Sequence, residues 1–317
     1  MGRAGIAVTV VIGAVVAIHP MRAQAPVPTP MTTTAVPHVG IVVNDMDEAI
    51  RRFQDIFGVA IEHVQDVGPL VFRGAPPPDG APSRLKVAAF KVGHMGFELV
   101  QPVAGPSPHR RFLDRYGQGL RHVAFEVKDA QAGVNYLVSK GGTRTTSSDV
   151  DMQDVLGFTV EVREPNTPTA VPPTTRIVTQ TPLSSTVISH IGIVVPDIDK
   201  TSRMFSEIFG VSGPPVRTAS LSLPEGRPSN GVPMVIRFVN FIVGNMRLEL
   251  VQPVSGPSPH QDHLARFGPS LHHIGFDLEV PKIGIDYLVS KGGRWRTAPS
   301  VDVRNILGFQ AELLPPP

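Results

Sequence analysis

Cysteine is absent from this sequence of 317 residues, and its positive and negative charges nearly balance. A chain without cysteine forms no disulfide, offers neither a thiolate metal ligand nor a cysteine nucleophile, and suits an oxidising compartment. The formal net charge is only +2, and no Lys/Arg-rich run is present. Because nucleic-acid-binding proteins carry a basic patch or stripe, this composition argues against a nucleic-acid partner.

The sequence has few features of a membrane protein apart from one apolar run near its start. Residues 4–18 are predominantly apolar, follow Arg3 and precede the triplet Ala23-Gln24-Ala25. Such a run is short for a membrane-spanning helix and typical of a secretory signal peptide. We therefore predict a signal peptide over residues 1–25 and a periplasmic or secreted protein. An uncleaved membrane anchor is the alternative, because Pro26 is an awkward residue directly after a cleavage site.

The sequence does contain an internal repeat with an offset of 151 or 152 residues. The matching segments are His38–Val43 with His190–Val195, Leu99–Val103 with Leu250–Val254, Tyr136–Gly142 with Tyr287–Gly293, and Leu156–Phe158 with Leu307–Phe309. The length also allows two domains. We predict a leader over residues 26–35, a first domain over 36–165, a Pro/Thr-rich linker over 166–186 and a second domain over 187–317.

Strand and helix patterns alternate within each copy. Hydrophobic patterns predict strands over residues 38–43, 85–92, 96–103, 121–127 and 157–163 of the first copy, and helices over residues 45–57 and 130–140. Ser107 followed by Pro108 is typical of the start of a short helix. The order strand, helix, strands occurs twice in each copy. We therefore expect an α+β chain with four such modules.

Histidine and glutamate recur in the two copies at matching spacings. The first copy has His38, Glu98, His122 and Glu161, separated by 60, 24 and 39 residues, and the second has His190, Glu249, His273 and Glu312, separated by 59, 24 and 39. Imidazole and carboxylate groups bind borderline divalent metals. Each set therefore predicts one metal site.

Strand alternation predicts that each set lies on one face of a sheet. His38 and Gly40 point one way along their strand, whereas Val39 and Ile41 point the other way, toward a helix. The other polar members oppose apolar neighbours in the same manner. Isolated polar residues on a solvent face would be the alternative, but it does not account for eight residues that recur in register.

These motifs resemble the vicinal oxygen chelate superfamily, which includes glyoxalase I, methylmalonyl-CoA epimerase, ring-cleaving dioxygenases and fosfomycin- and bleomycin-resistance proteins. The resemblance covers both copies, over residues 36–165 and 187–314, and residues 106–113 and 119–125 are most similar to the epimerases. It implies two βαβββ modules per domain that close a cup around a metal. In that family the ligands lie on the first and last strands of each module, where the eight histidines and glutamates stand here.

The number of ligands narrows the implied activity. Dioxygenases and fosfomycin-resistance enzymes of the superfamily use three protein ligands, whereas glyoxalase I and the epimerases also fill the position of Glu98 and Glu249. Four protein ligands on a six-coordinate ion leave two positions for a substrate with vicinal oxygens. The resemblance therefore implies an isomerase or lyase that stabilises an enediolate of a small carbonyl substrate with a divalent ion (Ni, Co, Zn, Mn or Fe).

Proton transfer also requires a base. In the family the last carboxylate ligand can serve, which nominates Glu161 and Glu312 as catalytic residues. The epimerases use a further glutamate between the early strands. In residues 68–83 of this chain the only acid is Asp79, and Glu225 of the second copy has no matching position.

Other polar residues differ between the copies or have a simpler interpretation. Arg163, two residues beyond Glu161, could bind a substrate anion, but Leu314 stands there in the second copy, where Arg247 replaces Gly96. If both cups are active, we expect their substrates to differ. We interpret His109 and His260 as first-turn helix residues. Strand alternation places His272 on the face opposite His273, so we do not count it as a ligand.

Two other functions remain open at this point. One is an extradiol-type ring-cleaving dioxygenase that uses iron, against which the additional glutamates argue. The other is a non-catalytic protein that binds a small molecule or a metal. The identity of the metal cannot be derived from two histidines and two glutamates alone, because affinity order and availability decide it.

Overall fold

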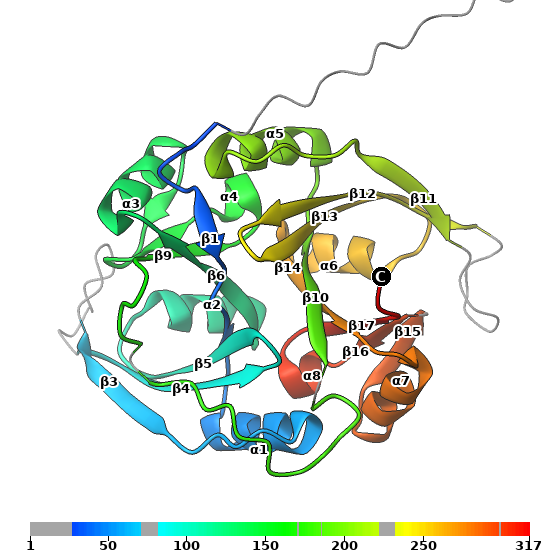
Figure 1. Cartoon of the computed structure of the whole chain (residues 1–317), viewed down its shortest axis with the longest axis horizontal. Helices are drawn as coiled ribbons and strands as arrows, with labels where there is room; N and C mark the ends of the chain where they lie inside the picture. The colour runs from blue at the N-terminus through cyan, green and yellow to red at the C-terminus, as the bar shows by residue number, and fades with distance from the viewer. Residues whose placement is uncertain (1–26, 71–81, 170, 185, 222–231, 298) are drawn as a thin grey trace, which may run out of the picture.

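The computed structural model describes residues 27–317 except 71–81, 170, 185, 222–231 and 298, and in these residues the strands form two curled sheets, one from each copy (Figure 1). The first sheet has the strand order β3-β4-β5-β2-β6-β9-β8-β7, with β1 paired to β6, and the second has β11-β12-β13-β10-β14-β17-β16-β15. Apart from β1, the two orders are equivalent strand by strand. The expected α+β class, with two βαβββ modules in each copy, is confirmed.

The elements of the first copy follow the predicted order. They are β1 (Thr33–Ala35), β2 (His38–Val42), α1 (Met46–Phe57), β3 (Val64–Leu70), β4 (Ser83–Val92), β5 (Met95–Ala104), α2 (Pro108–Tyr116), β6 (Gly119–Val127), α3 (Ala130–Ser139), β7 (Thr143–Arg144), β8 (Asp149–Asp151), α4 (Gln153–Leu156) and β9 (Thr159–Arg163). Two helices begin at a residue whose side chain caps the first turn. Asp45 accepts a hydrogen bond from the Glu48 amide, and Ser107 accepts one from the Arg110 amide.

The second copy repeats this series without a counterpart of β1. Its elements are β10 (Val187–Val194), α5 (Ile198–Phe209), β11 (Arg217–Leu221), β12 (Met234–Val243), β13 (Met246–Ser255), α6 (Pro259–Phe267), β14 (Ser270–Asp277), α7 (Pro281–Ser290), β15 (Arg294–Thr297), β16 (Ser300–Asp302), α8 (Arg304–Leu307) and β17 (Gln310–Leu314). The strands β3, β7, β8 and their counterparts were not among the predicted elements.

The two copies pack against each other through the helix-covered faces of their sheets. One hydrophobic core extends through both copies, and it contains Val39 and Ile41, whose side chains were predicted to point under the helix. Across the junction, the rings of Phe57 and Phe276 lie 5.7 Å apart, and those of Phe125 and Phe209 lie 4.9 Å apart. These pairs are equivalent under the repeat, so the copies share a core with approximate two-fold symmetry.

Polar contacts at the rim of the junction repeat in the same way. The hydroxyl of Tyr136 donates to the carbonyl of Glu207, and Lys140 pairs with the Glu207 carboxylate at 2.5 Å. In the other direction, Tyr287 donates to the carbonyl of Asp55, and Lys291 pairs with its carboxylate at 2.6 Å. In both copies, therefore, a tyrosine and a lysine at the end of α3 or α7 bind the C-terminal end of the first helix of the other copy, α5 or α1.

The segment between β9 and β10 runs along the first copy as an extended chain. It forms isolated bridges between Val59 and Ile177 and between Phe90 and Thr174. Within the described part of the chain, no helix has the length and apolar character needed to cross a membrane. The predicted signal peptide lies outside the described residues, and the predicted domain boundaries remain predictions.

Candidate metal centres

The four predicted donors of the first copy come from adjacent strands in the middle of its sheet. His38 lies on β2, Glu98 on β5, His122 on β6 and Glu161 on β9. Gly40, two residues along from His38, pairs with both Glu98 and His122, and Glu161 pairs with the residue two beyond His122. Because residues two apart on a strand share a face, this register brings all four side chains to one side of the sheet. We call this concave side the first cup.

The donor atoms of the first cup lie within range of one ion. His38 Nε2 lies 3.0 Å from Glu161 Oε2 and 3.3 Å from His122 Nε2, and His122 Nε2 lies 3.3 Å from Glu161 Oε2. Glu98 is more distant, with its Oε1 atom 3.9 Å from His122 Nε2. Ligands that each lie about 2 Å from an ion are separated by up to about 4 Å. The two histidines and Glu161 fit this spacing, and Glu98 stands at its limit.

The second cup, formed by the equivalent residues of the second copy, is more complete. His190 Nε2 lies 3.0 Å from His273 Nε2 and 2.9 Å from Glu312 Oε2. Glu249 Oε2 lies 3.2 Å from His273 Nε2 and 3.8 Å from that of His190. All four side chains thus bring one ligand atom each into a common cluster, whereas in the first copy the cluster holds His38, His122 and Glu161.

Glycines leave the space that the histidine rings occupy. A Cβ atom built on Gly40 would lie 1.9 Å from Cε1 of His122, and one on Gly192 would lie 2.0 Å from Cε1 of His273. Neither approach is physically possible, so any larger residue would displace the ring. The glycine that the sequence places two residues after the first histidine therefore fixes the orientation of the histidine on the neighbouring strand.

The carboxylates perturb the histidines of the first cup, and the histidines perturb the carboxylates. Burial lowers the pKa of His38, but the Glu161 carboxylate outweighs it, and the net pKa is raised. Burial acts to raise the pKa of Glu161, yet His38 and His122 hold it well below its usual value. The pKa of Glu98 is raised, mainly by burial. Glu161 is thus the anionic partner, while Glu98 more readily holds a proton.

Comparable effects act in the second cup. Burial lowers the pKa of His273, but Glu249 and Glu312 outweigh it and raise the pKa. Burial opposes ionisation of Glu312, but the hydrogen bond from His190 and the charge of His273 bring its pKa down to about 2. In both cups the last glutamate is therefore a carboxylate at neutral pH and points at two imidazole nitrogens.

The first cup opens into a cavity of about 640 Å³, whose lining includes Glu98, His122, Glu161, His109 and Arg163. Arg163 is 7% exposed and lies with Nη1 3.9 Å from Glu161, while its Nη2 donates to the Thr167 carbonyl. Its buried Nε has no hydrogen-bond partner. The inner-face position predicted for Arg163 brings a cation beside the donors, in the space a substrate would occupy.

His109 lines the first cup, which its interpretation as a first-turn helix residue did not predict. It lies in the first turn of α2, as expected, but it is buried and forms part of the cavity wall. Burial and the nearby Arg121 lower its pKa well below the usual value. The recurrence of this histidine in both copies was the one sequence feature that pointed to the cup. Its position in the helix did not show which way the side chain points.

Alternation along β6 and β14 is broken next to the second histidine of each cup. His122 pairs with Gly40, whereas Leu120 pairs with Ile41, so that Arg121 is an additional residue in its strand. His272 occupies the same place between Leu271 and His273. A bulge of this kind reorients the extra residue. The expectation that His272 faces away from His273 is wrong, because their Nδ1 atoms lie 2.9 Å apart.

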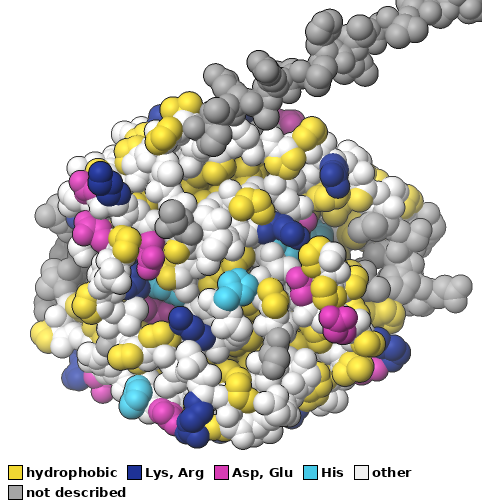
Figure 2. Space-filling model, in the orientation of Figure 1, with side chains coloured by type: hydrophobic (Ala, Val, Ile, Leu, Met, Phe, Trp, Pro, Cys, Tyr) yellow, Lys and Arg dark blue, Asp and Glu magenta, His cyan; other side chains and the backbone are white. Residues whose placement is uncertain are grey.

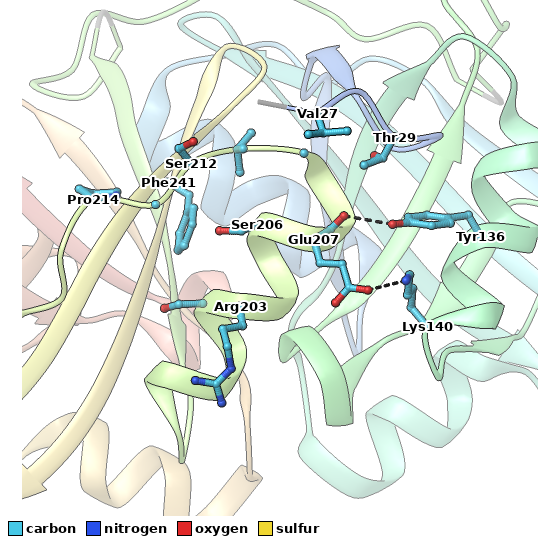
Figure 3. A pocket seen from close by; sticks show the side chains of 14 residues that line it. Val27, Thr29, Tyr136, Lys140, Arg203, Ser206, Glu207, Ser212, Pro214 and Phe241 are labelled. Atoms are coloured by element: carbon cyan, nitrogen blue, oxygen red, sulfur yellow. Dashed lines mark hydrogen bonds and ion pairs between the residues drawn. The ribbon is translucent and has the colours of Figure 1, made fainter. Parts of the chain in front are cut away.

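A cavity of about 760 Å³ lies away from both cups, where the leader meets α3 and α5 (Figure 3). Tyr136, Lys140 and Glu207 line it and already bond to one another across the junction. It contains none of the His/Glu clusters found in the described residues. Its position at the junction and its satisfied ion pair indicate a packing feature, so the cups remain the candidate sites.

The sequence matches the model of the Glyoxalase/Bleomycin resistance protein/Dioxygenase superfamily twice, over residues 37–170 and 189–303. The chain belongs to this superfamily. Its members are generally metal-dependent enzymes that use a divalent ion. The two matched regions coincide with the two copies, and each contains histidines of one cup.

Known relatives cover parts of the chain. The uncharacterized protein YqjC of Bacillus subtilis (strain 168) is 31% identical over 88 residues, which are 28% of this chain and 54% of that protein. The chain thus spans about half the length of this curated relative. A triple mutant of 4-hydroxymandelate synthase from Streptomyces coelicolor has a similar fold, with a TM-score of 0.58 and 15% identity over 82% of this chain and 76% of the synthase.

Methylmalonyl-CoA epimerase from Mycobacterium tuberculosis matches at 25% identity with a TM-score of 0.33, over 44% of this chain and 94% of the epimerase. The likeness to the synthase covers most of both proteins, and at 15% identity it concerns the fold alone.

The donor chemistry of both cups fits a divalent ion. Each cup directs two imidazole nitrogens and an ionised carboxylate to one point, at separations of 2.9–3.6 Å. Such a set is typical of sites for zinc, nickel, cobalt or iron. His38, His122, Glu161 and Glu98 could hold an ion in the first cup, and His190, His273, Glu312 and Glu249 in the second. Their role as ligands remains a prediction.

Two further acids of the sequence analysis cannot be placed. Asp79 and Glu225 lie outside the described residues. Among the described residues, Glu161 and Glu312 are ionised carboxylates in direct contact with the histidines of the cups.

Proposed function

We propose that the chain is a metal-dependent isomerase or lyase that moves a proton at a carbon next to a carbonyl group. The observation that carries this proposal is the fourth donor: Glu249 lies within 3.2 Å of His273 and joins a cluster of two histidines and two glutamates. A bound divalent ion would act as a Lewis acid on the carbonyl oxygen. Four protein donors leave room for a substrate with two neighbouring oxygens.

Glu161 and Glu312 would hold the proton that moves. Each is ionised at neutral pH, because its pKa is well below 7, and each is partly open to the cup with 17% and 23% of its side chain exposed. A carboxylate of this kind can accept a proton from the carbon and return it to the same or a neighbouring carbon. His38 and His190, which contact these carboxylates, orient them toward the cup.

The test is metal analysis followed by hydrogen exchange in D₂O. Purified full-length protein is loaded separately with nickel, cobalt, zinc and manganese, and small hydroxycarbonyl compounds are screened by NMR for loss of a C–H signal. We expect exchange that Glu161→Gln and Glu312→Gln together reduce about 100-fold or more. Exchange with no dependence on either glutamate would contradict the assignment of the bases.

A ring-cleaving dioxygenase is the second candidate, and one observation favours it for the first cup. There the close cluster is His38, His122 and Glu161, with Glu98 farther away. Two histidines and one carboxylate are the ligand set of many non-haem iron oxygenases. Oxygen uptake with a catechol, dependent on iron and lost in Glu161→Ala, would support this function over the isomerase.

A binding protein without catalysis is the third possibility from the sequence. It would bind a small molecule or metal tightly with no turnover. Small-molecule affinity would be unaffected by Glu161→Gln and Glu312→Gln, whereas metal affinity would fall, because both glutamates are predicted ligands. The same screen therefore separates the three functions, because each predicts a different dependence on the two glutamates.

We also propose export to the periplasm or the cell exterior and a small-molecule substrate as the partner. The basis is the apolar run of residues 4–18 and the absence of a basic run in the sequence. On the face drawn in Figure 2, Lys/Arg and Asp/Glu side chains are interspersed rather than gathered by sign. Cell fractionation of the full-length chain tests export, and an uncleaved chain in the membrane fraction would indicate the anchor.

A further inference from the structure

Next to the second cup lies a group of histidines that the first copy lacks. His260, in the first turn of α6, His272 and His273 each offer a ring nitrogen, and these three atoms lie within 4.8 Å of one another. His272 Nδ1 and His273 Nδ1 are 2.9 Å apart. His273 directs its other nitrogen, Nε2, at His190 in the cup. One ring thus stands between the cup and the histidine group.

We infer that His260, His272 and His273 form a second metal site in the second copy, for a late divalent transition metal such as Ni²⁺ or Cu²⁺. His273 would serve both sites, with Nε2 on the ion in the cup and Nδ1 on this one. For that, its ring releases the remaining N–H proton to the solvent. This assignment goes beyond the proposed function and shares His273 with it.

An unused nitrogen in a buried position supports this site. Nδ1 of His260 is buried without a hydrogen-bond partner, and burial of such an atom is costly. His272 is 3% exposed, and its Nδ1 faces the Nδ1 of His273, so that an ion bound there would be a common partner for both atoms. His260 is half-buried and leaves the site open on one side.

The charge around the histidine group also favours a cation. His273, which belongs to the group, also contacts the Glu249 carboxylate at 3.2 Å through its Nε2 atom. Glu249 and Glu312 are close enough to act on His260. Arg304, on the other side, is paired with Asp302 at 2.8 Å.

The first copy shows what the group replaces. Arg121 stands at the position of His272 and pairs with Asp149 at 3.2 Å, with its Nη1 also 3.4 Å from His109 Nε2. A guanidinium at this place excludes a metal cation. In the second copy the equivalent of Asp149 is Ser300, so both members of the ion pair are exchanged together. The exchange removes a charge pair and leaves nitrogen ligands in its place.

The separation of the two Nδ1 atoms indicates the kind of ion. Two nitrogens 2.9 Å apart, each about 2.0–2.1 Å from an ion, subtend an angle of about 90° at it. This is the angle between neighbouring ligands in square-planar and octahedral sites, which Cu²⁺ and Ni²⁺ adopt.

Nickel binding to the full chain tests the site. The metal-free protein is saturated with Ni²⁺, passed through a desalting column and analysed by mass spectrometry of the eluted metal. We expect three ions per chain, and two for His272→Arg, which restores the residue of the first copy, and for His260→Gln. The matched control is His263→Phe, because His263 bonds to Ser270 and its equivalent is Phe112. It should retain three.

Two ions in the wild type, or three in both His272→Arg and His260→Gln, would overturn the inference. Two ions in these variants also show that the second cup is intact and that the chain has folded. Failure of the proposed cups gives a different pattern: the wild type would bind one ion, and His272→Arg would bind none. If one variant loses all ions because it does not fold, the other variant still tests the site, since His272 lies on β14 and His260 on α6.

Discussion

The two copies are nearly identical where they touch each other and differ where they face their cups. At the junction, aromatic and polar contacts recur as symmetric pairs, as with Phe57–Phe276 and Phe125–Phe209. In the cups, Arg163 is replaced by Leu314 and Arg121 by His272. A shared core constrains both partners of a packing contact, whereas each cup varies independently. The difference indicates one structural unit that carries two sites of different chemistry.

Removal of one histidine from each cup should give the largest difference between the two copies, measured as the number of Ni²⁺ ions lost. His122→Ala should remove one Ni²⁺ ion from the chain, whereas His273→Ala should remove two, because only His273 is shared with the histidine group. In each variant we expect the affinity of the altered cup to fall more than about 100-fold. Calorimetric titration gives both counts. Equal losses from the two variants would contradict the asymmetry.

Glycine substitutions should weaken each cup without removing a ligand. Gly40→Ala brings a Cβ to 1.9 Å from the His122 ring, and Gly192→Ala does the same at 2.0 Å to His273. Each ring must move, so we expect the metal affinity of the affected cup to fall about 10- to 100-fold. Each variant is the control for the other. If both cups weaken together in one variant, the sites are not independent.

Exchange of the residue two positions after the last glutamate of each cup should change how strongly that cup binds an anion. Arg163 contributes a cation within 3.9 Å of Glu161, and the second copy has Leu314 instead. We expect Arg163→Leu to weaken binding of oxalate to the first cup by about 10-fold and Leu314→Arg to strengthen it in the second by a similar factor. Calorimetry on protein with one cup disabled measures each effect, and unchanged affinities would assign Arg163 a structural role.

The smallest expected effect is a change in the pH dependence of the free energy of unfolding. Burial lowers the pKa of His263 to about 3, so the unfolded chain, near pKa 6.5, binds a proton more readily than the folded one. Stability therefore falls as pH decreases below 6.5. His263→Phe should reduce that loss by about 1 kcal/mol between pH 6.5 and 5.5. Urea unfolding in EDTA measures it, and an identical loss in both proteins would show that His263 does not titrate on unfolding.

The strands that carry the cups could be predicted because apolar side chains alternate with polar or small ones along most of their length. Val39 and Ile41 are apolar and face the core, so His38, one residue before Val39, points to the opposite face together with Gly40. The recurrence of the pattern added the register of the second copy. By contrast, β3 carries mostly exposed residues without a hydrophobic face, and its pairing with β4 comes from the sheet rather than from its own sequence.

The histidine group could not be predicted because it depends on a break in that alternation. A bulge at His272 turns it toward His273, and nothing in the local sequence distinguishes this strand from a regular one. His109 and His260 were placed on the correct helices, but the direction of a first-turn side chain depends on how the helix packs against the sheet. Bulges and helix packing are tertiary features, which a pattern of residues does not contain.

Anomalous diffraction from crystals of the cobalt-loaded protein would test the central claim most directly. It predicts one peak about 2.0–2.2 Å from the donor atoms of His38, His122 and Glu161, and another at the same distance from those of His190, His273 and Glu312. Cobalt peaks that avoid both cups in fully loaded crystals would contradict the account.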